Sequence, residues 1–202
     1  MKIGDNILGA AFELFMKYGV RSVSMDDIAN VLGVSKKTIY TKIDSKENLI
    51  KKVIRIHLLQ DEKEIRKITN ESTDAIDEIH AISKHVMQFL MQIKPSLIFD
   101  LKKYYPDCWT LIEGQHFSFI RETIQNNIVR GQNENLYRND LDPFVIAKLY
   151  VAKSNTIVNQ EIFPISEFDL ISLMKQLENY HLHGIVSENG RKKLSSLSIY
   201  NS

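Results

Sequence analysis

The chain has 202 residues, of which 44% are hydrophobic and 25% are charged, as is ordinary for a globular protein with a sizeable core. Its one cysteine, Cys108, excludes an intramolecular disulfide framework and a cysteine zinc cluster. No apolar run is long enough to cross a bilayer, and residues 1–5 include an acid and no apolar segment, which is unlike a signal peptide. We therefore expect a cytoplasmic protein with no membrane partner.

The first predicted helix spans residues 3–18, where apolar side chains recur at helical spacing until Gly19 ends the pattern. A short helix is expected over 24–32, because Ser24 followed by Asp27 resembles a capping box. Gly33 breaks it, and Ser35 is expected to cap a third helix over 35–42. A long fourth helix begins after Asp44 or Ser45.

The later part of the chain also has only helical periodicity. Further helices are predicted over 73–93, 95–104, 106–130, 143–160 and 166–185, with a polar loop over 131–142. Pro95, Pro106 and Pro143 stand where a first helical turn tolerates proline. Few glycines and prolines, and no convincing alternation of apolar and polar residues, indicate an all-α protein of about nine helices.

Positive charge is concentrated near the beginning of the chain. Residues 1–55 hold ten Lys and Arg against six Asp and Glu, and residues 33–55 hold seven against two. Such a basic segment can bind phosphate. A solvated helix face would have the same composition, so charge alone does not show whether this segment binds phosphate.

The segment 24–43 has the pattern of a helix-turn-helix, in which two short helices meet at a turn. The small Ala29 allows the helices to approach, and Gly33 can adopt the positive φ that the turn needs. Four apolar residues are spaced to bury together: Ile28, Leu32, Val34 and Ile39.

The second helix of this motif presents cationic and hydrogen-bonding groups that suit a DNA major groove. They are Lys36, Lys37, Thr38, Tyr40, Thr41 and Lys42, and Ser35 would leave the helix N-terminus near phosphate. The alternative is an ordinary helical hairpin whose basic residues only keep it in solution.

Residues 7–49, ILGAAFELFMKYGVRSVSMDDIANVLGVSKKTIYTKIDSKENL, resemble the DNA-binding domain of the TetR/AcrR family of transcriptional regulators. The chain departs from the family at Ile43, where an aromatic is usual, and at Lys42, where His or Tyr is frequent. The resemblance implies that Ser24, Lys36, Thr38, Tyr40 and Lys46 contact DNA.

The resemblance also implies a DNA-binding domain over residues 1–47 and a helical ligand-binding and dimerisation domain over 48–202. It is weaker beyond Leu49. Residues 135–143 are similar to the family's loop into helix eight, and His183-Gly184-Ile185 with Gly190 and Leu194 is similar to its C-terminal tail.

Several aromatic residues and a histidine at helical spacing are candidates for a small-molecule pocket, which is mostly apolar with a few polar groups. The candidates are Phe89, Tyr105, Trp109, His116 and Phe119. The alternative is that each is an ordinary core residue.

The last two long helices are candidates for a homodimer interface. Residues 170–180 carry an apolar arc wider than one core face needs, and residues 144–158 include small residues that permit close approach. A four-helix bundle across a two-fold axis would bury the excess. The arc could instead pack within its own subunit.

The sequence contains no enzyme motif of the P-loop, G-x-S-x-G, H-E-x-x-H or G-x-G-x-x-G type. His85, His116, His181 and His183 do not form a metal-binding pattern, so no metal and no cofactor are expected.

The predicted function is non-enzymatic: a ligand-responsive regulator, most simply a repressor, that binds a palindromic operator in double-stranded DNA as a homodimer. A small-molecule effector would release it by tilting the fourth helix. The alternative is a DNA-binding regulator whose second domain serves only dimerisation.

Overall fold

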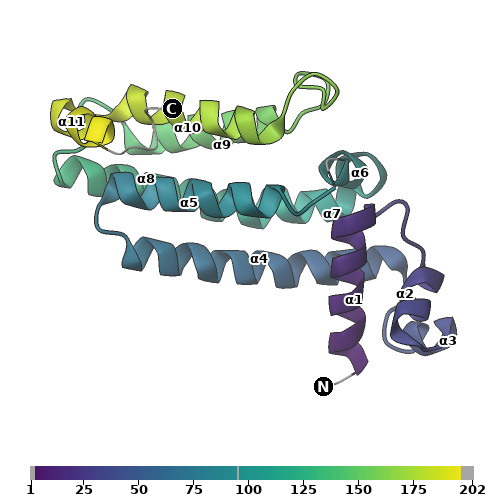
Figure 1. Ribbon diagram of the computed structural model, residues 1–202. Coiled ribbons are helices and arrows are strands. Elements are labelled where there is room, and N and C mark those ends of the chain that lie inside the picture. Colours follow the sequence, from purple (N-terminus) through teal and green to yellow (C-terminus); the bar gives the residue numbers. More distant parts are fainter. Residues whose placement is uncertain (1–2, 95, 197–202) are drawn as a thin grey trace. The chain divides into compact units, whose positions relative to one another are not determined.

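The computed structural model describes residues 3–94 and 96–196 (Figure 1). In these residues the chain forms eleven α-helices and one π-helical segment, η1, and no β-strand. The predicted all-α class is confirmed. Pro95, where a predicted helix would begin, lies outside the described residues. The chain divides into two compact units, the first comprising residues 1–62 and 92–116 and the second the remainder.

The first unit contains the three N-terminal helices and a second group formed later in the chain. Its complete elements are α1 (Ile3–Tyr18), α2 (Met25–Leu32), α3 (Lys36–Tyr40), α6 (Leu97–Tyr104), α7 (Pro106–Leu111) and η1 (Ile112–His116). The helix α4 (Lys46–Glu71) starts in this unit and ends in the second. Ile7, Ile28, Ile39 and Leu49 are fully buried, whereas Leu32 and Val34 are half-buried.

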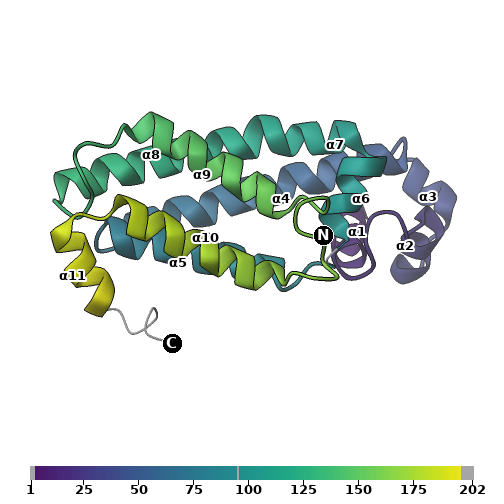
Figure 2. The same ribbon diagram turned by 90° about the horizontal axis from the view of Figure 1, so that it is seen from above.

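The second unit is built around four packed helices. Its complete elements are α5 (Ala75–Leu90), α8 (Phe117–Asn133), α9 (Pro143–Ile157), α10 (Leu170–Ile185) and α11 (Glu188–Ser196). Both α5 and α9 pack against α8 and α10, so these four helices enclose the core (Figure 2).

One predicted helix, over 106–130, is interrupted in the structure. The π-helical segment η1 separates α7 from α8, and Gly114 lies at its centre. Glycine is a poor residue for a regular helix, and π turns widen the backbone locally. The prediction of one continuous helix was wrong because apolar spacing alone does not detect this change of register.

The helix α11 was not predicted, because its residues are mostly polar. It begins where the Ser187 hydroxyl accepts a hydrogen bond from the Gly190 N–H at 3.1 Å. A Cβ on Gly190 would collide with the backbone carbonyl of Leu136, so only glycine fits there. Lys193 on α11 pairs with Asp74, which caps α5. Long-range contacts therefore hold this polar helix in place.

The connection between α8 and α9 is fixed by one buried tyrosine. The Tyr137 hydroxyl donates a hydrogen bond to the carbonyl of Ala75 at 2.9 Å, and the Asn127 amide donates to the same carbonyl at 2.8 Å. A Cβ on Gly131 would collide with the Tyr137 ring. Tyr137 also forms an isolated antiparallel bridge with Val186. This loop is thereby tied to α5, α8 and the end of α10.

Candidate nucleic-acid interface

The turn between α2 and α3 is set by short-range hydrogen bonds. The Ser24 hydroxyl accepts from the Asp27 N–H at 3.2 Å, and the Asp27 carboxylate accepts from the Ser24 N–H at 2.7 Å, which completes the predicted capping box. The bonds from the Ser24 N–H and hydroxyl hold the pKa of Asp27 below its ordinary value. Gly33 ends α2 with φ 64°, in the left-handed region, as the turn requires.

The helix α3 has one buried face and one exposed face. Ser35 caps it by accepting a hydrogen bond from the Thr38 N–H at 3.1 Å, and Ile39 is fully buried beneath it. Thr38 is half-buried, with its hydroxyl 2.9 Å from that of Ser35. The remaining residues predicted to contact DNA from this helix and its two ends are exposed: Ser35, Lys36, Lys37, Tyr40, Thr41 and Lys42. The prediction that α3 presents these groups to solvent is confirmed; their contact with DNA stays a prediction.

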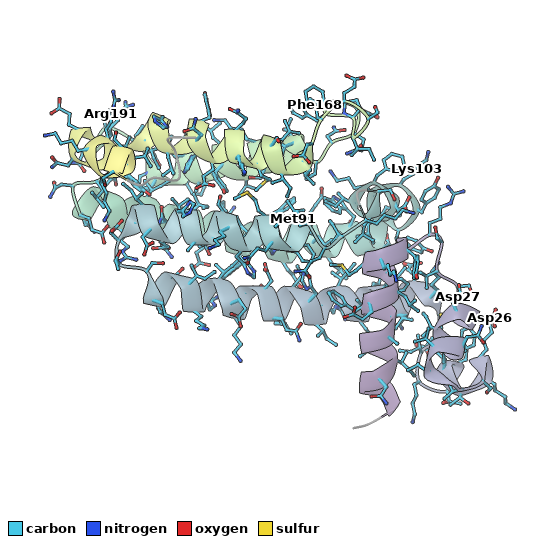
Figure 3. The ribbon with its side chains drawn as sticks, viewed as in Figure 1. Asp26, Asp27, Met91, Lys103, Phe168 and Arg191 are labelled. Atoms are coloured by element: carbon cyan, nitrogen blue, oxygen red, sulfur yellow. The ribbon has the colours of Figure 1, made fainter. Side chains whose placement is uncertain are left out.

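One of these lysines is already paired within the motif. Lys36 Nζ lies 2.8 Å from the Asp26 carboxylate, and this hydrogen bond raises the pKa of Lys36 above its ordinary value. Asp26 lies on the first turn of α2 beside Asp27 (Figure 3). DNA phosphate would have to compete with Asp26 for Lys36. Nothing in the sequence pattern indicates this pair, because it joins two helices across the turn.

Lys46, the first residue of α4, contacts the segment that precedes α2. Its ammonium donates a hydrogen bond to the Arg21 carbonyl at 3.4 Å and lies 5.7 Å from the centre of the Tyr105 ring. Ser45 caps α4 by accepting from the Asn48 N–H at 3.1 Å, which settles the predicted choice between Asp44 and Ser45. The first turn of α4 is therefore anchored beside the start of α2.

Arg21 is a further basic residue of this region, and the sequence pattern did not indicate it. Its guanidinium donates a hydrogen bond to the Tyr104 hydroxyl at 3.0 Å and lies 4.6 Å from the centre of that ring. The only sequence signal was a basic residue three positions before the Ser24 cap. Arg21 and Lys46 thus both contact tyrosines at the junction of α6 and α7.

Comparison with known proteins agrees with this geometry. Residues 7–53 match the family model of bacterial regulatory proteins of the tetR family. Over 186 residues the chain is 24% identical to the uncharacterized HTH-type transcriptional regulator YvaF of Bacillus subtilis (strain 168), covering 90% of this chain and 95% of that protein. The N-terminal part of the chain therefore matches the DNA-binding domain of tetR-family transcriptional regulators. The segment α2–α3 is the helix-turn-helix of this matched region.

Solved structures share the fold along nearly the whole chain. A transcriptional regulator from Cytophaga hutchinsonii ATCC 33406 is 22% identical, with a TM-score of 0.74 over 91% of this chain and 98% of that one. A regulator from Saccharomonospora viridis, solved in complex with choline, is 19% identical, with a TM-score of 0.71 over 92% and 98%. The likeness in fold to these regulators therefore extends beyond the matched N-terminal segment.

The five residues predicted to bind an effector are divided between the two units. Tyr105, Trp109 and His116 belong to the first unit, and Phe89 and Phe119 belong to the second. Within the first unit, the Lys102 ammonium lies 4.5 Å above the Trp109 ring. The structure does not bring the five together within either unit, so the predicted effector site stays a prediction.

His116 and Phe119 are both extensively enclosed by protein. Burial lowers the pKa of His116 below its ordinary value, with Asp61 Oδ2 at 3.7 Å from its Nδ1 acting in the opposite direction. Phe119 is buried with the Arg66 guanidinium 4.9 Å from its ring centre. Enclosed side chains of these types suit a mostly apolar ligand site, and they equally suit a protein core.

Two surface cavities each lie within a single unit. One, of about 330 Å³, is formed by α1 and α4 in the first unit, and the other, of about 610 Å³, by α9 and α10 in the second. None of the five predicted effector residues lines either cavity. Across residues 3–94 and 96–196 no group of three or more metal-ligating side chains is gathered, and no helix is long and apolar enough to cross a membrane.

Proposed function

We propose that this chain is a TetR-family repressor that binds a palindromic operator as a homodimer and leaves it when a small-molecule effector binds. The observation that carries the DNA-binding half of this proposal is the exposed face of α3. Lys37 and Tyr40 are exposed on this helix and Lys42 just beyond its end, while the buried Ile39 anchors the helix and leaves these groups able to enter a groove. Lys46 adds a cation at the start of α4.

The homodimer is proposed to form through α9 and α10. Phe144, Val145, Leu149 and Tyr180 on these helices are exposed, which is costly for large apolar side chains unless a partner covers them. A two-fold axis places two copies of α3 in successive major grooves, about 34–36 Å apart. A palindromic operator follows from that symmetry.

Effector release is proposed to act through α4. This 26-residue helix begins with Lys46 in the first unit and contributes its last residues to the second. A ligand that tilts α4 would change the separation of the two copies of α3, so that both could no longer enter their grooves together. The choline complex of the Saccharomonospora viridis protein supports a small organic effector as a class.

A second candidate is a regulator without a small-molecule ligand. The burial of Phe119, which suits an ordinary core residue, favours it. In both candidates we propose a non-enzymatic protein that acts in the cytoplasm. We also propose a DNA-binding domain over residues 1–47 and a second domain over 48–202.

The two candidates are separated by selecting bound duplexes from a random DNA pool and then screening small molecules against the complex. The repressor proposal expects an effector that weakens operator binding by about 5- to 150-fold, and an equal weakening of effector binding by operator. If no small molecule in the screen binds the chain and changes operator affinity, effector release fails and the second candidate is favoured. If no duplex is enriched, the DNA-binding proposal fails in both forms.

A further inference from the structure

The first unit carries a second group of cations near the start of α2, apart from the exposed face of α3. Arg21 lies three residues before the cap Ser24, and Lys103 lies near the end of α6. Both basic side chains are exposed, and both belong to the first unit. Figure 3 shows Lys103 projecting from α6 on the same side of this unit as Asp26 of α2. The fold therefore brings together two basic residues that are far apart in the sequence.

Tyr104 contacts both of these cations. The Arg21 guanidinium lies 4.6 Å from the centre of the Tyr104 ring and donates a hydrogen bond to its hydroxyl at 3.0 Å. The Lys103 ammonium lies 5.5 Å from the centre of the same ring and 5.3 Å from that of Phe99. An aromatic ring attracts a cation without neutralising its charge. Tyr104 therefore holds two positive groups near each other and leaves both of them charged.

The acidic side chains of this region are engaged elsewhere. Glu47 at the start of α4 and Asp107 at the start of α7 both lie close to Lys51, with carboxylate oxygens 2.7 Å and 3.6 Å from its ammonium. Within residues 3–94 and 96–196, neither Arg21 nor Lys103 forms an ion pair with a carboxylate. The two cations therefore leave a local positive charge that an anionic partner can balance.

Arg21 also adjoins residues that are predicted to contact DNA. The Lys46 ammonium donates a hydrogen bond to the Arg21 carbonyl at 3.4 Å, and Ser24 follows three positions later. The Asp27 carboxylate accepts from the Ser24 N–H and hydroxyl, both at 2.7 Å, so it is engaged within the capping box. The predicted DNA surface at Ser24 and Lys46 therefore continues onto Arg21.

We propose that Arg21 and Lys103, both held by Tyr104, bind backbone phosphates of the operator. Arginine suits this role because its guanidinium carries several N–H donors, of which Tyr104 takes one. The others can form the bidentate contact that arginine makes with phosphate. Such a contact positions the motif on the duplex without reading its sequence. This inference rests on the proposed DNA binding and extends the contact surface from α3 to the segment before α2 and to α6.

A purely structural role would explain only part of this arrangement. The contact between Arg21 and Tyr104 could serve to attach the segment before α2 to α6. Lys103, however, belongs to the same helix as Tyr104, so its contact with the ring attaches no further element. A phosphate-binding surface accounts for both cations and for the absence of a carboxylate paired with either of them in the described part of the chain.

The test is the salt dependence of binding between the full chain and a selected duplex, measured by fluorescence anisotropy. Arg21→Gln should lower the slope of log affinity against log salt by roughly two, one phosphate contact from each subunit. Adding Lys103→Gln should lower the slope further, whereas Arg21→Lys keeps the charge and should keep the slope. Arg191→Gln, at an exposed arginine of α11 in the second unit, is the matched control and should leave the slope unchanged.

The orienting role of Tyr104 is tested by Tyr104→Phe, which removes only the hydroxyl that accepts from Arg21. Operator binding should weaken about 3-fold in the otherwise wild-type chain, and it should not weaken further in the Arg21→Gln chain. Equal weakening in both chains would show that the hydroxyl does not act through Arg21, and would overturn this part of the inference.

The outcomes separate this inference from the proposed function. A wild-type chain that enriches no duplex, or binds with a flat salt dependence, overturns the DNA-binding proposal and this inference together. A steep wild-type slope that Arg21→Gln does not lower overturns this inference alone, and so does a double variant with the slope of Arg21→Gln. A changed base preference of Arg21→Gln in selection from a random pool would also overturn it, because a phosphate contact reads no sequence.

Discussion

The hydrogen bonds that cap the helices of the helix-turn-helix join residues close together in the sequence, whereas a central hydrogen bond of the second unit joins residues far apart. In the motif, the caps join residues three positions apart, as in Ser24 with Asp27 and Ser35 with Thr38. In the second unit, the tie between Tyr137 and Ala75 spans 62 positions. Local bonds set the ends of α2 and α3, which then pack through Ile28 and Ile39, whereas the tie in the second unit forms only when distant segments meet. The start of each helix of the motif is therefore encoded by residues close together in the chain.

The largest expected effect of a single substitution lies in the long-range region. Gly131→Ala places a Cβ against the Tyr137 ring, which cannot withdraw without losing its hydroxyl bond to Ala75. We expect the free energy of unfolding to fall by about 3 kcal/mol in urea titration. Gly9→Ala in α1 meets no atom within 4 Å and should stabilise slightly through helix propensity. Equal effects of the two substitutions would contradict this account of the second unit.

A pH dependence should also originate in the second unit. Burial lowers the pKa of His181 to about 4 from an ordinary value of 6.5. Because the unfolded chain binds the proton more readily, stability is lost as the pH falls through this window. The loss should be about 2 kcal/mol at pH 5 relative to pH 8. Urea titrations of wild type and His181→Gln at one protein concentration isolate the contribution of His181 to this pH dependence. That contribution should be absent from the variant. The same slope in both would rule out His181 as its source.

A smaller effect is expected from the local caps. Ser24→Ala removes the acceptor for the Asp27 N–H and should cost about 1 kcal/mol of unfolding free energy. Hydrogen exchange should show the lost protection mainly in α2, because the cap is confined to that helix. Ser24→Thr keeps a hydroxyl and is the control. Loss of protection spread through α5 and α8 would mean that the motif is not held locally.

The smallest expected effect is on DNA affinity, and it concerns the ion pair between Lys36 and Asp26. Asp26→Asn removes a negative charge from the exposed face and frees the lysine, so operator affinity should rise about 2- to 5-fold at low salt. Fluorescence anisotropy with a selected duplex measures it. Glu64→Gln removes the same charge from an exposed position on α4 within the second unit and should have little effect. A loss of affinity in Asp26→Asn would show that the pair positions Lys36 for DNA.

Much of the motif could be predicted from sequence because its determinants are close together in the chain. Ser24, Gly33 and Ser35 were each placed correctly, and the burial of Ile39 followed from spacing. The pair of Lys36 with Asp26 escaped prediction, because it depends on how two helices cross. The stacking of Arg21 on Tyr104 escaped for the same reason, with 83 positions between the partners.

The second unit could be predicted only as a set of helices. Apolar spacing located α5, α9 and α10 to within a few residues at each end. It missed α11, which depends on Lys193 reaching Asp74 and on Gly190 fitting against Leu136. It also could not decide whether Trp109 or Phe119 lines a ligand site, because a core and an apolar pocket use the same residue types. Features that depend on contacts between residues distant in the sequence cannot be predicted from the spacing of apolar residues.

The most direct test of the central claim is the salt dependence of operator binding by the full chain. A selected palindromic duplex should lose roughly three to five orders of magnitude in affinity between about 50 and 200 mM salt, if the dimer neutralises about six to ten phosphates. Lys37→Ala should lower the slope of log affinity against log salt by roughly two, one contact from each subunit. Lys63→Ala, an exposed lysine of α4 outside the motif, should leave the slope unchanged. A flat dependence in the wild type, or equal slopes for Lys37→Ala and Lys63→Ala, would contradict the claim that α3 binds DNA.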